Sequence, residues 1–295
     1  MKSDSTSRTH SEQINSLSNA HPQPMEKLMP FGLIHYNAPG DTFEEFVQYA
    51  ATTGFDSIEV MIYDVWPKDA EFDPTRAHEA KAILDKHGIA ASALTAANDF
   101  VQLDPAAIQQ QVDRMQQVSQ LAQILGTNVL RTEGGQPKDA VAPEKWAEAI
   151  AGCLKACVPF CQDMNIKLAV DNHGVVSNDP NVLLPALEAV GSEYIGSNLD
   201  TMNLRWWGNA VADLPGIYKA LAPYVFHTHM KDGTGSRAEY KGAVLGHGEI
   251  PLMTAVNALK EAGYNGVWCA EWEGKTDKAQ GYADCLAWMK ANCPG

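Results

Sequence analysis

The residues KLAVDNHG at positions 167–174 carry the pattern that decides the fold. Leu168, Ala169 and Val170 are apolar, and the residues that follow them directly are Asp171, Asn172 and His173. A strand that is apolar nearly throughout is typical of a parallel sheet, because both faces of such a sheet are buried. The segment therefore predicts a buried strand that ends in a cluster of polar side chains.

Seven other segments show the same change from an apolar run to a polar end. With Lys167–Asp171 they make eight expected strands: Phe31–Tyr36, Asp56–Ile62, Ile89–Ala96, Asn128–Thr132, Lys167–Asp171, Ile195–Asp200, Val225–Met230 and Gly266–Glu271. The segments between them carry helix signals. Asp41 and Thr42 precede apolar residues at helical spacing, and Asp104-Pro105 opens a long apolar-periodic run. Glycines that suit a left-handed helix end follow several of these runs, at Gly54, Gly88, Gly126, Gly191 and Gly263.

Eight repeats of strand and helix with no change in composition predict an α/β fold, a single (β/α)8 TIM barrel. We assign the barrel domain to residues 29–295. Residues 1–28 are polar and have no apolar stretch between Met1 and Met29. We expect them to form a disordered or extended N-terminal tail rather than a secretory signal.

The composition argues against several classes of partner. The net charge is −14, from 22 basic and 36 acidic residues, and it repels phosphate backbones and anionic membranes. No apolar run reaches the ~20 residues that a membrane span needs. Six cysteines in a chain of this length do not form a disulfide framework, and Cys153, Cys157 and Cys161 are best explained as buried small apolar residues of a helix. We expect a cytoplasmic protein that binds neither nucleic acid nor membrane, with a homo-oligomer left open.

The expected strand ends carry the candidate functional residues, because catalysis in such barrels gathers at the C-terminal ends of the strands. All eight ends carry charged, imidazole or amide groups: His35; Glu59; Asn98; Arg131 and Glu133; Asp171, Asn172 and His173; Asp200 and Asn203; His227, His229, Lys231 and Asp232; Glu271 and Glu273. One such group alone would be an ordinary loop residue. A complete ring of them predicts a site, because buried polar groups must be paired or used.

Four of these residues close the fifth to eighth strands: Asp171, Asp200, His229 and Glu271. Three carboxylates and one imidazole make an oxygen-rich set that suits Mn²⁺, Mg²⁺ or Co²⁺ better than a structural zinc site. We predict a divalent metal site here, with Mn²⁺ first and Mg²⁺, Co²⁺ or Zn²⁺ as alternatives. Ion pairing of each acid with a nearby Arg or Lys is less favoured, because few of the 22 basic residues lie near these ends.

His227 and His229 alternate along one strand, so they face the same side of it. One of them can bind the metal while the other orients it or contacts substrate. For His227, a packed interior histidine is the alternative interpretation.

Five motifs in order resemble those of the xylose isomerase-like barrel superfamily, the sugar isomerase/epimerase group that also contains endonuclease IV. They are VDNHG at 170–174, NLDTMN at 198–203, HTHMKD at 227–232, GHGEIP at 246–251 and CAEWEG at 269–274, and the resemblance covers Met29 to about Met289. It implies metal ligation by Asp171, Asp200, His229 and Glu271. It also implies proton transfer at a ketose carbon by the first and last carboxylates of this set, Asp171 and Glu271, while the metal polarises the carbonyl. The expected substrate-binding residues are His35, Glu59, Asn98, Glu133, Asn203, His227 and His247.

The chain departs from the family pattern at Asp171, where relatives usually have glutamate. The shorter side chain withdraws the carboxylate by about 1.5 Å, and a misplacement of about 1 Å can cost ~100-fold in rate. We expect Asp171 to keep the metal. The proton-transfer role is left open among the catalytic candidates Asp171, Glu271, His173 and Lys231.

The predicted function is a divalent-metal-dependent sugar isomerase or epimerase that enolises a ketose or keto-sugar. Alternatives are a lyase that splits 3-keto-glycosides by β-elimination and a non-catalytic sugar-binding subunit. A nuclease of the endonuclease IV type is disfavoured, because its zinc cluster needs many histidines and this chain has nine, two of them in the tail. The basic residues that could bind a phosphate are scattered along an acidic chain, so a neutral sugar is expected: Arg131, Arg205, Lys231, Arg237 and Lys241.

Overall fold

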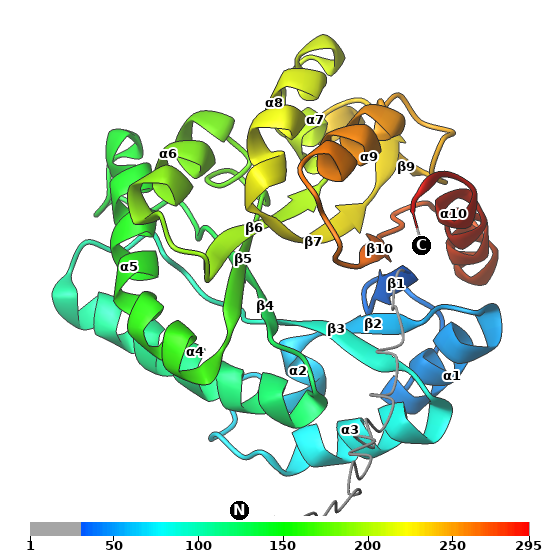
Figure 1. Cartoon of the computed structure of the whole chain (residues 1–295), viewed down its shortest axis with the longest axis horizontal. Helices are drawn as coiled ribbons and strands as arrows, with labels where there is room; N and C mark the ends of the chain where they lie inside the picture. The colour runs from blue at the N-terminus through cyan, green and yellow to red at the C-terminus, as the bar shows by residue number, and fades with distance from the viewer. Residues whose placement is uncertain (1–30, 295) are drawn as a thin grey trace, which may run out of the picture.

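The computed structural model describes residues 31–294, and the predicted tail at 1–28 lies outside them. Eight parallel strands close into a barrel in the order β1-β10-β7-β6-β5-β4-β3-β2 (Figure 1). Their bounds are β1 Phe31–Ile34, β2 Ser57–Val60, β3 Ala90–Thr95, β4 Val129–Glu133, β5 Lys167–Asp171, β6 Ile195–Asp200, β7 Val225–Met230 and β10 Trp268–Ala270. The predicted (β/α)8 barrel is confirmed, and each strand lies where its apolar run predicted it.

The observed strands differ from the expected ones mainly in their bounds. β1 ends at Ile34, so His35 and Tyr36 belong to the loop that follows it. β10 ends at Ala270, and Glu271 is the first residue after it. The backbone N–H of Glu271 still donates to the carbonyl of Met230 at 3.0 Å, which keeps Glu271 beside the end of β7.

The helices surround the barrel on its outer side (Figure 1). They are α1 Phe43–Thr53, α2 Ile62–Val65, α3 Thr75–His87, α4 Pro105–Leu125, α5 Trp146–Met164, α6 Pro180–Val190, α7 Asn203–Trp207, α8 Leu214–Leu221, α9 Leu252–Glu261 and α10 Lys278–Asn292, with short 3-10 turns at Pro143–Lys145, Val211–Asp213, Ala222–Tyr224 and Arg237–Glu239. Thr42 caps α1 in a capping box with Glu45, and Asp104 caps α4 through the N–H of Ala107. Both start signals are therefore confirmed.

Apolar side chains fill the space between the barrel and its helices. The three cysteines of α5, which are Cys153, Cys157 and Cys161, are all buried there as free thiols. Within residues 31–294, no helix is both long and apolar enough to cross a membrane.

A small antiparallel hairpin, β8 (Asp232–Thr234) paired with β9 (Lys241–Ala243), is inserted after β7 and was not predicted. Strands of three residues are too short to give an alternating pattern. The Asp232 carboxylate organises the region, because it accepts hydrogen bonds from the backbone N–H groups of Gly233, Gly246, Gly248 and Ile250. The hairpin thereby becomes a fixed wall at the mouth of the barrel.

Candidate metal centre and substrate cavity

Asp200, His229 and Glu271 bring one potential ligand atom each to a common point. These atoms lie within 4.8 Å of one another, and all three side chains are buried. They come from the ends of β6 and β7 and from the residue after β10, which follow one another around the barrel. The register of the parallel strands therefore assembles this part of the predicted set.

Hydrogen bonds fix how two of these side chains are oriented. His229 Nε2 lies 2.7 Å from Glu59 Oε2, so the opposite nitrogen, Nδ1, faces the centre. Asp200 Oδ1 accepts the backbone N–H groups of Met202 and Asn203, each at 2.8 Å. Each of these two candidate ligands is thus held by one atom while another is left for the centre.

The atoms that face the centre lack hydrogen-bond partners. Asp200 Oδ2 and His229 Nδ1 are both buried without one. Glu271 Oε2 lies 2.9 Å from His229 Nδ1, but that contact does not have the geometry of a hydrogen bond. Buried polar atoms are normally satisfied, and two unsatisfied atoms beside a carboxylate fit a divalent cation.

Asp171 is held apart from this group. One oxygen of its carboxylate contacts the guanidinium of Arg131, and the other accepts from Asn198 Nδ2 at 2.7 Å. The side chain is fully buried. Burial alone would raise the pKa of Asp171, but Arg131, together with His229, His173 and the hydrogen bond from Asn198, outweighs burial and lowers it. For Asp171 the structure shows the ion pair that was the less favoured interpretation of the sequence, and Lys231 likewise forms ion pairs with Glu271 and Asp200.

Lys231 places a buried positive charge beside the centre. Its ammonium lies 3.0 Å from Glu271 Oε1, 3.0 Å from Glu273 Oε1 and 3.6 Å from Asp200 Oδ2. Burial lowers the pKa of Lys231, but the carboxylates of Glu271, Asp200 and Glu273 outweigh it and leave the pKa well above its usual value. Lys231 is therefore a fixed ammonium that holds one oxygen of Glu271.

Burial also acts on Asp200, whose Oδ2 accepts no hydrogen bond. It raises the pKa of Asp200 to about 7, against the opposing effect of Lys231. A buried carboxylate with so little compensation is stabilised by any cation that enters the centre.

The other predicted site residues fall into groups. Glu59 and Asn203 contact the centre, through His229 and Lys231 respectively. Both ring nitrogens of His227 are bonded inside the barrel, Nδ1 to Asn198 Oδ1 at 2.9 Å and Nε2 to Ser92 Oγ at 3.1 Å. His227 has the environment of the packed interior histidine that was its alternative interpretation.

The remaining predicted residues lie farther out at the barrel mouth. The side chain of Asn98 is bonded to the backbone of Glu133, and both residues line a cavity of about 290 Å³. His35 stacks on Phe46 and lies 2.8 Å from Asp64. His173 is half-buried and lies near Asp171, whereas His247 is exposed and contacts no side chain of the centre.

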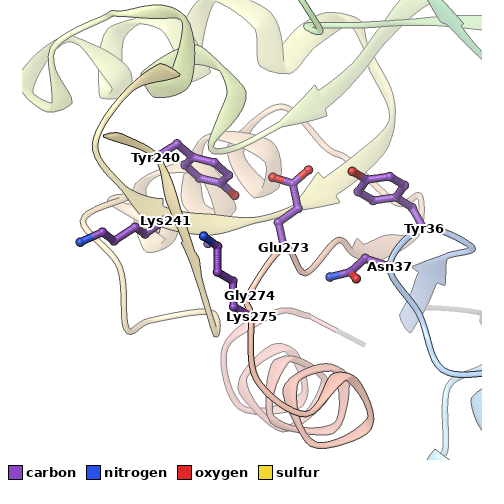
Figure 2. Close-up of a pocket in the computed structure, with 8 residues that line it drawn as sticks. Tyr36, Asn37, Tyr240, Lys241, Glu273, Gly274 and Lys275 are labelled. Carbon is purple, nitrogen blue, oxygen red and sulfur yellow. The ribbon is translucent and has the colours of Figure 1, made fainter. Parts of the chain in front are cut away.

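A larger cavity, of about 830 Å³, opens beside the centre between three loops (Figure 2). Its wall comprises Tyr36, Asn37, Tyr240, Lys241, Gly242, Glu273, Gly274 and Lys275. In Figure 2 the carboxylate of Glu273 lies between the rings of Tyr240 and Tyr36. Because Glu273 contacts Lys231, and Lys231 contacts Glu271, the cavity adjoins the centre. Its volume lies within the usual range for small-molecule sites.

Most of this wall was not identified as a site from the sequence. The sequence predicts Tyr36 inside a strand, and it predicts no site role for Tyr240 or Lys275. The only available signal was the proximity of Lys275 to the CAEWEG motif. The hairpin that brings Tyr240 and Lys241 to the mouth has no sequence pattern of its own.

Comparisons with known proteins agree with this architecture. The model of the xylose isomerase-like TIM barrel family matches residues 47–292. The L-ribulose-5-phosphate 3-epimerase UlaE of Escherichia coli O157:H7 is 24% identical over 277 residues, which cover 90% of this chain and 96% of that protein. A solved D-psicose 3-epimerase, determined in the presence of D-fructose, superposes with a TM-score of 0.72 at 15% identity over 90% of this chain and all of that one. The IolI protein, solved with a bound zinc atom, has a TM-score of 0.72 at 16% identity over 89% and 97%.

We predict that Arg131→Met destabilises the protein by about 3–5 kcal/mol, because it leaves the buried Asp171 carboxylate without its counter-charge. Urea denaturation measures the effect. Arg205→Met is the matched control, since the pair of Arg205 with Glu249 is partly exposed and should contribute about 1 kcal/mol or less. Adding Asp171→Asn to Arg131→Met should restore part of the stability. Equal effects of the two arginine variants would contradict this interpretation of Asp171.

Proposed function

The chain belongs to the xylose isomerase-like TIM barrel family, and on this premise we propose that it is a divalent-metal-dependent sugar isomerase or epimerase that enolises a ketose or keto-sugar. The similarity to sugar epimerases supports the substrate class. The observation that carries the proposal is a pair of buried atoms without hydrogen bonds, Asp200 Oδ2 and His229 Nδ1, beside the carboxylate of Glu271.

The proposed metal ligands are Asp200, His229 and Glu271, with Asp171 as the fourth if its carboxylate turns from Arg131. Mn²⁺ is the first candidate, because the set has more oxygen than nitrogen, and Mg²⁺, Co²⁺ or Zn²⁺ remain alternatives. When bound, such an ion polarises a carbonyl oxygen and stabilises the negative charge that forms when a neighbouring proton is removed.

The chain's own residues orient the metal ligands and transfer protons. Glu59 holds the imidazole of His229 with Nδ1 directed to the centre. Glu271 is the proposed proton-transfer group nearest to the cavity. Lys231, held as an ammonium 3.0 Å from Glu271, can act only as a proton donor, and Glu273 links both groups to the cavity wall. His173 is the half-buried candidate next to Asp171.

The ion pair of Asp171 favours keeping β-elimination of a 3-keto-glycoside as the second candidate function. Epimerisation needs a proton-transfer group on each face of the reacting carbon, whereas elimination needs one group to remove the acidic proton. Asp171 is held by Arg131 and Asn198. Its carboxylate and that of Glu271 are therefore not equally free to transfer a proton.

We expect the protein, loaded with Mn²⁺, to exchange the hydrogen beside a substrate carbonyl with deuterium from D₂O. Nuclear magnetic resonance on a panel of ketoses and 3-keto-glycosides measures this exchange. EDTA should abolish it, and Mn²⁺ should restore it, because enolisation depends on the polarised carbonyl. Exchange that survives EDTA in metal-free protein would refute metal dependence. A panel that binds to the protein without exchange would instead favour a non-catalytic sugar-binding subunit.

Glu59→Gln should weaken Mn²⁺ binding by about 10–100-fold, because the neutral amide no longer increases the basicity of His229. Titration followed by electron paramagnetic resonance gives the Kd. Glu44→Gln is the control, since Glu44 forms an exposed pair with Lys86 far along the chain from the centre. Unchanged affinity in folded Glu59→Gln protein would show that His229 does not bind the ion.

A further inference from the structure

Some of the basic side chains at the barrel mouth already contact an acidic or aromatic side chain of the protein, and others do not. Four of the five that the sequence offers for an anion have partners: Arg131 with Asp171, Arg205 with Glu249, Lys231 with Glu271, and Arg237 over the ring of Trp206. The fifth, Lys241, forms no recorded ion pair within residues 31–294. It lines the large cavity.

The structure places a second unpaired lysine on the same wall. Lys275 lies on the loop after β10, is exposed, and likewise forms no ion pair among the described residues. In Figure 2 its side chain extends from that loop toward the hairpin that carries Tyr240 and Lys241. Two loops that are distant in sequence therefore bring both lysines to one cavity.

Close backbone packing makes this arrangement specific. A Cβ atom added at Gly242 would lie 2.5 Å from the backbone carbon of Glu273 and 2.9 Å from the nitrogen of Gly274. Only glycine allows the β9 backbone to approach the loop after β10 this closely. Lys241 directly precedes Gly242, and Lys275 directly follows Gly274, so this contact holds the backbone segments that carry the two lysines close together.

The charge of this wall is opposite to that of the whole chain. Among the residues that line the cavity, the single acid is Glu273, and its carboxylate lies 3.0 Å from the ammonium of Lys231. The two unpaired lysines leave the wall positive in a protein of net charge −14. A positive cavity in an acidic protein attracts anions locally while the remaining surface repels them.

We propose that this cavity binds an anionic group, a phosphate or a carboxylate, at the end of the sugar remote from the reacting carbon. The inference rests on the proposed function for the position of that carbon, at Glu271. Lys241 and Lys275 supply the charge, since ammonium groups bind phosphate and carboxylate oxygens as point charges. Substrate preference is thus set by the hairpin and the loop after β10, and it reverses the expectation of a neutral sugar.

Isothermal titration calorimetry on the full chain with Mn²⁺ tests the proposal. The probes are two pairs that differ in charge, D-ribulose 5-phosphate against D-ribulose and 5-keto-D-gluconate against D-fructose. We expect at least one anion to bind about tenfold more tightly than its neutral partner, and added NaCl should reduce this preference by screening. The pair of probes with the larger ratio of anion affinity to neutral-sugar affinity identifies phosphate or carboxylate as the natural group.

The double variant Lys241→Gln/Lys275→Gln should lose the preference while keeping its affinity for the neutral sugars. Lys278→Gln, an exposed lysine outside the cavity wall, should keep both. Equal binding of charged and neutral probes, or a preference that survives in the double variant, would overturn the proposal. These outcomes are independent of the deuterium exchange, so a failure of the proposed enolisation is recognised separately.

Discussion

The hydrogen bond between Glu59 and His229 determines how the centre is built. It crosses the barrel interior from β2 to β7, at 2.7 Å between two fully buried side chains. A buried imidazole with one nitrogen bound to a carboxylate has its other nitrogen fixed in direction. The direction of His229 Nδ1 follows, and Asp200 and Glu271 converge on it because their strands lie on either side of β7. The barrel thus determines where the three side chains lie, and the hydrogen bond from Glu59 determines the orientation of the His229 imidazole.

Charge balance explains why the acids around this centre are not equivalent. Arg131 compensates Asp171, and Lys231 compensates Glu271 and Glu273. The Oδ2 atom of Asp200 accepts no hydrogen bond and lies 3.6 Å from the same ammonium. A buried carboxylate is costly without compensation, so a deficit of positive charge remains at the point where Asp200 Oδ2 lies. That point lies beside a cavity whose outer wall is positive, an arrangement that suits a ligand with a polar reacting end and an anionic remote end.

The sequence predicted the barrel well, because parallel strands buried on both faces have a strong apolar pattern and the caps at Thr42 and Asp104 have local chemical causes. It also placed Asp200, His229 and Glu271 together, since neighbouring strands must end at the same face. The pairing of Asp171 with Arg131 could not be predicted, because it depends on the side-chain directions of two strands. The cavity wall was missed for a different reason: the hairpin at 232–243 is defined by backbone contacts to Asp232, and such contacts leave no periodic signal.

Diffraction from crystals grown with Mn²⁺, collected at the manganese absorption edge, tests the account most directly. We expect one anomalous peak inside the barrel mouth, about 2.0–2.3 Å from Asp200 Oδ2, His229 Nδ1 and Glu271 Oε2. The bond from His229 Nε2 to Glu59 should remain in place. An empty centre with Lys231 still between the carboxylates, or peaks confined to exposed acids of the surface, would contradict the central claim that these three side chains form a metal site.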